Sequence, residues 1–427
     1  MKRIHGSESI LLAKDGGKPL RTRPWPSRGH VGREEKAAVN ALFAEAIRTG
    51  EAPGYNGPHE ESYCQAFARW MGGGFADAVN SGTSAVYVAL RSLDLEPFTE
   101  IIVGAVTDPG GLMPIPLMNC IPMIADVAPG SYNTGPDQIA SLITKRTSAI
   151  LVAHIAGEPA DMTGIMKVAR RYRLPVVEDC SQAHGARLNG RLVGTFGDMA
   201  AFSTMFGKHH CTGGQGGVVF TRSEKFYWRS RQISDRGKPF GLTPDSENCV
   251  ASLNFNLSDL GGVIGLAQLR KLPGIVRRRR AVVAKLARQI KGVRSVSIPQ
   301  PLPGAEPSYW FLRMRFHPEA ARCGRDEFFA ALAAEGLPGM ADYTVHAPHR
   351  KDWFRNRRVF GTSGFPWTCP LYKGDPDQSF PCPNLDQVGA THFTVSINEA
   401  WTDADIHDAA AIIHKVDRAL GRPSVCA

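Results

Sequence analysis

The sequence predicts an α/β protein whose larger domain contains a mixed, mostly parallel sheet between helices, followed by a smaller C-terminal α/β domain. Two observations support this prediction. Over the first two thirds of the chain, apolar runs of strand length alternate with segments of helical periodicity, which is typical of a parallel sheet covered by helices. From about residue 265 the pattern changes to a basic helix, one apolar run and two further helices.

The elements of the larger domain follow in order along the chain. Apolar runs predict strands over residues 100–107, 121–127, 148–155, 174–179 and 216–221. Helical periodicity between them predicts helices over residues 83–93, 135–143 and 162–173. Ligands of such sheets bind beyond the carboxyl ends of the strands, so we expect the chemistry where these runs end.

The last third of the chain predicts the second domain. Its elements are helices over residues 277–290, 325–337 and 403–420, a strand over 309–316, and a Pro- and aromatic-rich stretch over 366–383. At 427 residues the chain exceeds one ordinary core. We therefore expect an N-terminal arm (1–31), a large domain (32–264) and a small domain (265–427).

Composition excludes several classes of protein. With 43% hydrophobic and 21% charged residues the chain is typical of globular proteins, and no apolar run approaches the 18 residues of a membrane span. The apolar run near the N-terminus, residues 10–13, is too short for a signal peptide. The nine cysteines are scattered and lack metal-ligand spacing, so we expect free thiols, no metal site and a cytoplasmic location.

The charge balance points to anionic ligands rather than to nucleic acid. The formal net charge is +10, and its densest block is "RRRR" at residues 277–280. Neither interleaved aromatic residues nor a helix-turn-helix pattern accompanies this block, so we expect no nucleic-acid partner.

One lysine stands out in the stretch "FSTMFGKHHCTGGQGGVVF", residues 202–220. Lys208 could be a surface charge, a phosphate-binding lysine or a covalent attachment point. The motif GxxxxGK[ST] of nucleotide loops is absent, because the first glycine is missing and His209 follows the lysine. A surface lysine does not explain why other polar groups gather at the same strand ends.

Two carboxylates end the predicted strand 174–179. Either Glu178 or Asp179 could cap the following turn, or one of them could hold a cation at the ligand edge of the sheet. No second carboxylate or histidine lies at metal-ligand spacing. A protonated ring nitrogen of a cofactor is therefore a better partner than a metal ion.

An anion site is predicted where a helix begins. Gly82, Thr83 and Ser84 follow the strand-like "ADAVN", and free amides, hydroxyls and the helix dipole at such a place attract anions. Serine and threonine are also ordinary helix caps, so this pattern has two explanations. Ser203, five residues before Lys208, adds a third hydroxyl.

Together these groups suit a cofactor that carries an aldehyde, a phosphate and a basic ring nitrogen. Pyridoxal phosphate requires a lysine that forms a Schiff base, an anion site, and a carboxylate that keeps the ring protonated. Lys208, the turn at residues 82–84 and Asp179 could supply them.

Longer motifs carry a family resemblance. "EDCSQAHGARLNGRLVGTFGDMAAFS", Lys208 and "GGQGG" follow one another, and the supporting motifs are "GYNGPHEESYCQAFARWMG", "NSGTSAVYVAL", "DMTGIMKVARRY" and "NFNLSDLGGVIGLAQLRKL". Over residues 54–272 the chain resembles the DegT/DnrJ/EryC1/StrS family of pyridoxal phosphate-dependent aminotransferases. The resemblance implies fold type I and a homodimer with active sites at its interface.

The family also implies roles for single residues. Lys208 would bind the cofactor and then move the proton, Asp179 would pair with the pyridine nitrogen, and Gln182 would lie by the ring. Gly82, Thr83, Ser84 and Ser203 would surround the phosphate, and Asn254 would reach the phosphate of the neighbouring subunit.

This chain departs from the family at several positions. Asp108, which we place among the cofactor-binding residues, replaces an aromatic residue that commonly stacks on the ring, and Gln215 replaces the usual acidic residue of the glycine turn. Asn256 stands where a basic residue often faces the substrate. Candidate substrate residues are Tyr55, His209, Tyr343 and His346, with Trp310 and Asn398 as further contributors. The alternative for His209 and its neighbour His210 is that they pack in the protein or point to solvent.

We therefore expect an aminotransferase that moves an amino group from glutamate or glutamine to a keto group on a sugar or sugar-like ring. Nucleotide-linked keto sugars and keto-cyclitols both fit, in amino-sugar, cell-surface polysaccharide or antibiotic biosynthesis. The alternatives are a pyridoxal phosphate enzyme of another reaction type, namely a lyase, decarboxylase or condensing enzyme, and a non-catalytic regulatory homologue. The presence of both Lys208 and Asp179 argues against the last.

Overall fold

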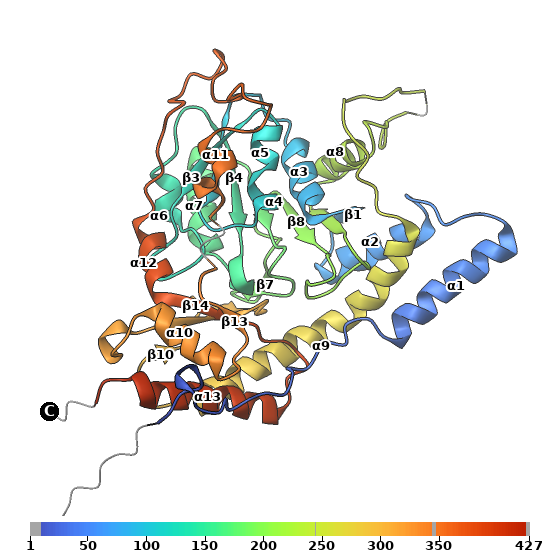
Figure 1. Cartoon of the computed structure of the whole chain (residues 1–427). Helices are drawn as coiled ribbons and strands as arrows, with labels where there is room; N and C mark the ends of the chain where they lie inside the picture. The colour runs from blue at the N-terminus through green and yellow to red at the C-terminus, as the bar shows by residue number, and fades with distance from the viewer. Residues whose placement is uncertain (1–9, 244, 344–346, 424–427) are drawn as a thin grey trace, which may run out of the picture.

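A seven-stranded sheet forms the centre of the larger part of the computed structural model, which describes residues 10–243, 245–343 and 347–423 (Figure 1). Its strands, in spatial order, are β1 (Phe75–Val79), β9 (Gly217–Thr221), β8 (Met199–Ser203), β5 (Val176–Asp179), β4 (Thr147–Ala153), β2 (Glu100–Gly104) and β3 (Ile121–Ala125). The strands from β8 to β3 are parallel, and β9 runs antiparallel to both of its neighbours. The predicted mixed, mostly parallel sheet is confirmed.

Helices cover both faces of this sheet, which explains why its strands are almost continuously apolar. Side chains alternate along β2, so Ile101 and Val103 pack with helix α3 (Gly82–Ser92), whereas Ile102 packs with α7 (Met162–Tyr172). Helix α2 (Pro58–Trp70) covers the β1 end of the sheet, and α8 (Glu224–Ser234) contacts β1 and β9. The remaining short helices here are α4 (Pro109–Leu112), α5 (Pro114–Leu117) and α6 (Pro136–Ala140).

The predicted strands match five of the seven in this sheet within a few residues, and the strand-like "ADAVN" becomes β1. Strand β8 has the sequence "MAAFS" and is absent from our predicted strands. Its small residues lack a β-branched run, and burial on both faces determines its conformation instead.

A long helix joins the two parts of the molecule. Helix α9 (Asp259–Gln289) begins against α2 and continues to the final helix α13 (Asp403–Leu420), with Pro273 in its interior. Helix α1 (Arg33–Thr49) packs along α9 and projects to one side (Figure 1). The predicted domain boundary at residue 264 falls inside α9.

The smaller part contains a four-stranded antiparallel sheet in the order β10 (Val296–Ser297), β12 (Leu312–Phe316), β14 (His392–Val395) and β13 (Gly339–Met340). Helix α10 (Arg325–Ala334) and α13 pack against it in one apolar cluster. Of its strands, we predicted the one over residues 309–316.

Two segments connect the parts further. In the predicted N-terminal arm, Trp25 stacks on Trp401 with ring centroids 4.3 Å apart, and Arg21 pairs with Asp405 at 2.8 Å. Part of the C-terminal third returns to the larger sheet through Trp367 and other aromatic residues near helices α11 (Asp352–Arg355) and α12 (Pro383–Thr391). Within the described ranges, no helix has both the length and the apolar character that crossing a bilayer requires.

Candidate active site

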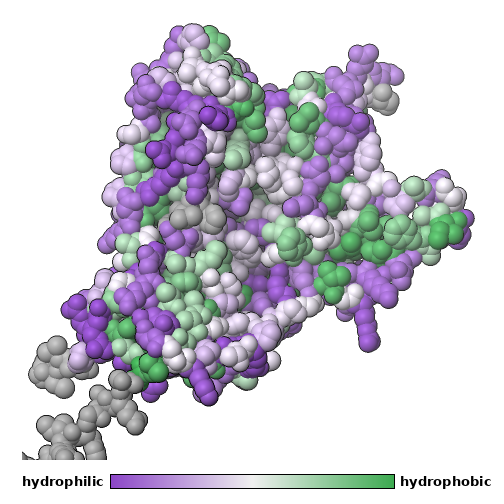
Figure 2. Space-filling model, viewed as in Figure 1, coloured by the Kyte–Doolittle hydropathy of each residue, from purple (hydrophilic) through white to green (hydrophobic). Residues whose placement is uncertain are grey.

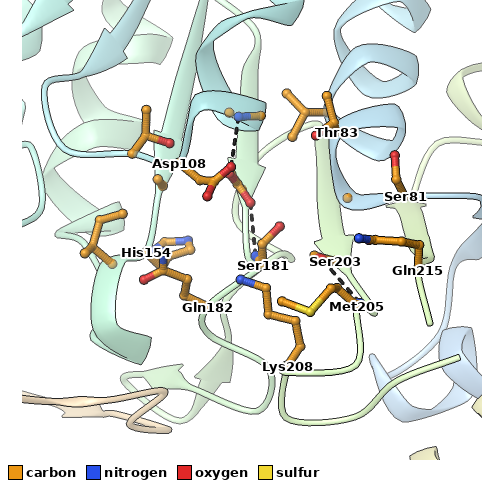
Figure 3. A pocket seen from close by; sticks show the side chains of 18 residues that line it. Ser81, Thr83, Asp108, His154, Ser181, Gln182, Ser203, Met205, Lys208 and Gln215 are labelled. Atoms are coloured by element: carbon orange, nitrogen blue, oxygen red, sulfur yellow. Dashed lines mark hydrogen bonds between the residues drawn. The ribbon is translucent and has the colours of Figure 1, made fainter. Parts of the chain in front are cut away.

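A cavity of about 240 Å³ lies beyond the carboxyl ends of the parallel strands, where the N-terminus of α3 also points (Figure 3). Seven residues proposed from the sequence line it: Gly82, Thr83, Asp108, Asp179, Gln182, Ser203 and Lys208. Figure 3 shows Lys208, Asp108 and Thr83 facing this space from different sides. Strands and loops distant in sequence therefore bring the predicted chemical groups to one place.

The structure distinguishes the two carboxylates at the end of β5. Glu178 is fully buried and accepts hydrogen bonds from the amides of Gly194, Phe196 and Gly197, each at 2.7 Å. Asp179 lines the cavity and accepts a hydrogen bond of 3.0 Å from the amide of Ser181. Glu178 therefore holds the following turn, and Asp179 is the carboxylate that a ligand can reach.

Asp179 is electrostatically prepared for a cationic partner. Burial raises the pKa of its carboxyl group, while the hydrogen bond from Ser181 and the charge of Lys208 lower it. A buried carboxylate with few compensating charges favours binding of a positive group.

Lys208 lies in the loop after β8 and is only 6% exposed. Burial lowers the pKa of its amine to about 8, against the opposing attraction of Asp179 and Asp108. Its Nζ lies 3.8 Å from the ring centroid of Trp310, a cation–π contact. At pH 7 roughly a tenth of this amine is therefore unprotonated and nucleophilic, far more than at the ordinary lysine pKa of 10.5.

The opposite end of the cavity is the N-terminus of α3. Ser81 caps this helix by accepting a hydrogen bond of 3.0 Å from the amide of Ser84, and the Ser84 hydroxyl donates to Asn80 at 2.6 Å. Ser84 is thus part of the cap and does not line the cavity, unlike Gly82 and Thr83. The first amides of a helix have no partner within it, so this end suits an anion.

Glycines allow a close approach of backbone around the cavity. A Cβ atom on Gly82 would lie 2.5 Å from Cβ of Ser203, and one on Gly111 would lie 3.0 Å from Oδ2 of Asp179. Both distances are too short for ordinary packing, so larger residues would close the space that the anion site and the carboxylate share.

Asp108 contributes a polar wall where relatives often carry an aromatic ring. Its Oδ1 accepts a hydrogen bond of 2.9 Å from the amide of Gly110 and caps the short helix α4. Thr107 lines the cavity beside it. On this side the cavity is therefore polar.

Gln182 is fixed from both ends. Its Oε1 accepts from the amide of Ala156 at 2.9 Å, and its Nε2 donates to Oη of Tyr343 at 2.7 Å. Tyr343 itself does not line the cavity. Its contribution is to hold Gln182, which differs from the predicted substrate contact.

The histidines after Lys208 lie in the interior rather than in the cavity. Nε2 of His209 donates a hydrogen bond to Ser308 O (3.2 Å), and His210 is hydrogen-bonded to His184 (2.9 Å) and to Tyr63 (2.8 Å). Burial lowers the pKa of His210 to about 3 and that of His209 well below its usual range. They are neutral packing residues, so the substrate role predicted for His209 does not agree with its position.

Other predicted residues lie away from this cavity in the same chain. Tyr55 is on the surface, where its hydroxyl accepts a hydrogen bond from Arg236 at 3.0 Å, and Asn254 bonds to Asn256 at 2.8 Å. Asn398 donates to Pro26 O at 2.9 Å. His346 lies outside the described residues.

Some cavity residues escaped the sequence analysis. They are Ser81, Val86, Thr107, Gly110, Gly111, Ala153, His154, Ile155, Ser181 and Met205, while Gln215 entered it only as a departure from the family. The helix-cap pattern "NSGTS" could have identified Ser81. His154 accepts from the Ala160 amide through Nδ1 (3.1 Å), so its Nε2 donates to Glu178 (3.0 Å); only the fold brings it here.

Comparison with known proteins agrees with this geometry. The model of the DegT/DnrJ/EryC1/StrS aminotransferase family matches residues 33–373. A relative from Micromonospora echinospora, named "Putative L-glutamine:3-amino-2,3-dideoxy-scyllo-inosose aminotransferase", is 30% identical over 350 residues, which are 80% of this chain and 82% of the relative.

Solved structures show the same fold. S. venezuelae DesV, solved in complex with a ketimine intermediate, is 25% identical with a TM-score of 0.74, over 90% of this chain and 95% of that chain. An aminotransferase from Psychrobacter cryohalolentis is 24% identical with a TM-score of 0.77, over 92% and 97% of the two chains. The chain belongs to the DegT/DnrJ/EryC1/StrS aminotransferase family, and the predicted class of enzyme is confirmed.

Proposed function

We propose that this aminotransferase uses pyridoxal phosphate and transfers an amino group from glutamine or glutamate to the keto carbon of a sugar or cyclitol ring. The observation that carries the proposal is that Lys208 and Asp179 line one cavity with the N-terminus of α3. An amine, a carboxylate and an anion site are the three groups that the aldehyde, the pyridine nitrogen and the phosphate of this cofactor require.

The residues present fit the cofactor. Its phosphate would be held by the first amides of α3, Thr83 and Ser203, where Gly82 leaves the necessary room. Its ring nitrogen would pair with Asp179, whose buried carboxylate is only partly compensated by the positive charge nearby. When bound, the cofactor supplies an electron sink for the bonds at the amino carbon.

The side chains of the protein itself then accept and donate protons and orient around the reacting atoms. Lys208, with a pKa of about 8, can both accept and donate a proton near neutral pH. Burial raises the pKa of Asp179, and the Ser181 amide and the nearby lysine partly offset this by stabilising its carboxylate form. Gln182 is held rigidly by Ala156 and Tyr343, so it presents a fixed polar edge to the cavity.

The substrate class is supported by the relatives. The Micromonospora relative is named for glutamine as donor and for a keto-cyclitol as acceptor. Asn256 replaces a residue that is often basic in the family, which favours an acceptor without a nucleotide diphosphate. We therefore propose a keto-cyclitol first and a nucleotide-linked keto sugar second.

We further propose that the catalytic unit is a homodimer. Asn254, which the family resemblance places against the neighbouring subunit's phosphate, lies outside this chain's own cavity. Helix α1 projects with Phe43 and Ile47 exposed, at 47% and 84%, and Figure 2 shows hydrophobic surface over it. A second copy would bury this surface.

The described cysteines are all free, which supports a location in the reducing cytoplasm.

Absorption spectroscopy tests the cofactor and the donor. Purified protein mixed with pyridoxal phosphate is expected to show a visible band that disappears when L-glutamine or L-glutamate is added and returns with a keto-cyclitol. Lys208→Ala should lack this band, and Lys167→Ala, at an exposed position on α7, should retain it. A band that persists with both donors would contradict transamination, and an unchanged band in Lys208→Ala would contradict the role of the lysine.

A further inference from the structure

The backbone of the reactive lysine is held from behind by an arginine of the N-terminal segment. One Nη of Arg28 donates to the carbonyl of Lys208 at 2.7 Å and to that of Gly207 at 3.0 Å. The other Nη reaches the carbonyl of His209 at 3.4 Å. Three successive carbonyls of the catalytic loop therefore converge on one guanidinium, a geometry that the five donors of arginine can satisfy and the compact ammonium of lysine cannot.

A buried carboxylate connects this arginine to a second one. Glu399 accepts from Nε of Arg28 at 2.9 Å and from Nε of Arg279 at 2.8 Å, and its side chain is 4% exposed. Burial raises the pKa of Glu399, but the two guanidiniums more than offset this and hold it below the ordinary value. The carboxylate is therefore a fixed anionic bridge.

The second arginine continues to the ring that contacts the lysine. Arg279 is 2% exposed in its side chain and donates to the carbonyls of Tyr309 (2.7 Å) and Trp310 (2.8 Å). The indole of Trp310 donates to the Gly207 carbonyl at 3.1 Å and lies against the amine of Lys208. The contacts thus close a ring that begins and ends at Lys208.

This ring contains residues from parts of the chain that are distant in sequence. Arg28 belongs to the N-terminal segment, which Trp25 and Arg21 fix to the smaller part of the molecule. Arg279 lies on α9, and Glu399 lies between β14 and α13. None of the three lines the cavity.

We propose that Arg28, Glu399 and Arg279 form a positioning clamp that fixes the Lys208 backbone and the Trp310 ring relative to each other, and so places the Lys208 amine at the cavity. The clamp rests on the proposed function only in taking Lys208 as the reacting amine. Its members are positioning residues, because they act through Lys208 and Trp310 and touch no reacting atom.

The test is the reactivity of Lys208 in cofactor-free protein. Cyanate carbamoylates only the neutral amine. The rate of carbamoylation at Lys208 is followed by peptide mass spectrometry across pH 6–10, and its midpoint reports the environment in which the amine is held. Wild type should titrate near its pKa of about 8. Arg28→Lys and Glu399→Gln should raise the midpoint by roughly half a pH unit or more, because a released amine reaches water.

The matched control is Arg23→Gln. Arg23 lies on the same segment and pairs with Asp408 of the smaller part, but it has no contact with the catalytic loop. This variant should titrate as wild type. If Arg28→Lys and Glu399→Gln also titrate as wild type while remaining folded by circular dichroism, the clamp is wrong. Because Arg28 is partly exposed, its lysine variant is expected to fold even if Glu399→Gln does not.

Steady-state kinetics give a second, separable readout. Arg28→Lys is expected to lower kcat about 10-fold or more with little change in KM, since misplacing a reacting group slows the chemical step. If wild type shows no transamination, the proposed function fails while the carbamoylation profile still decides the clamp. If the variant loses catalytic efficiency only through a higher KM, with kcat unchanged, positioning of the amine is contradicted.

Discussion

At the scale of single residues, environment decides what each charged group can do. Glu178 and Asp179 are adjacent, yet one is enclosed by three backbone amides and the other faces the cavity. Their opposite directions follow from the alternation of side chains along a strand. The sequence could show that a carboxylate stood at the strand end, but the choice between the two depended on which face the loop at residues 194–197 covers.

Lys208 allows a prediction about pH and stability. Its pKa is lowered to about 8 in the folded protein, whereas the unfolded chain keeps the ordinary lysine value of 10.5. Between these values the unfolded state binds more protons, so the folded state gains stability as the pH rises. Relative to Lys208→Met, cofactor-free wild type should gain up to roughly 1.4 kcal/mol per pH unit in this window.

Urea unfolding at several pH values measures this difference. The Lys208→Met variant is the reference, because subtracting its free energy of unfolding removes the contribution of all other titrating groups. A difference that stays constant from pH 8 to pH 10 would show that the Lys208 amine is not desolvated in the folded protein.

At the scale of elements, the junction between β8 and α3 forms the anion end of the cavity. Gly82 begins α3 and lies directly against Ser203, the last residue of β8. Gly82→Ala should lower the free energy of unfolding by about 1–3 kcal/mol, since the new methyl group would overlap the Ser203 backbone and side chain. It should also weaken binding of pyridoxal phosphate.

The control for this change is Gly214→Ala in the glycine turn, where an added Cβ has nothing within 4 Å. Its free energy of unfolding should differ from wild type by a few tenths of a kcal/mol. Thermal or urea unfolding and a fluorescence titration with the cofactor measure both effects. Equal stability of the two variants would show that α3 can move away from β8 without cost.

Helices and strands could be predicted from the sequence where the local pattern of caps and apolar residues was strong. The last helix matches the predicted residues 403–420 because a polar cap, Thr402, precedes a regular apolar stripe. The short strands β10, β13 and β14 have no such local signal. Their conformation is selected by pairing, of β10 and β14 with β12 and of β13 with β14, and by burial under α10 and α13.

At the scale of the whole molecule, the proposed homodimer makes a distinctive prediction. If Asn254 of one subunit serves the other subunit's cavity, Lys208→Ala and Asn254→Ala disable different halves of a shared site. Mixing the two inactive proteins after reversible dissociation should restore about a quarter of wild-type activity, because half of the dimers are mixed and each has one intact site.

Mixing Lys208→Ala with Asp179→Asn is the matched control, since both residues line the cavity of the same chain. No activity should return in that mixture. Recovery in both mixtures, or in neither, would contradict a site that Asn254 completes from the neighbouring subunit.

The sequence by itself determined the α/β class, the positions of most main strands along the chain, and a candidate set of groups for an aminotransferase site, because these follow from local periodicity and from motifs contiguous in the chain. Only the tertiary structure decided that Asp179 rather than Glu178 faces the cavity, that His209 and His210 are buried, and that Tyr343 supports Gln182. It alone brought Arg28, Arg279 and Glu399 around Lys208. Such contacts join residues up to 371 positions apart, as in the Arg28–Glu399 pair, and no local pattern encodes them.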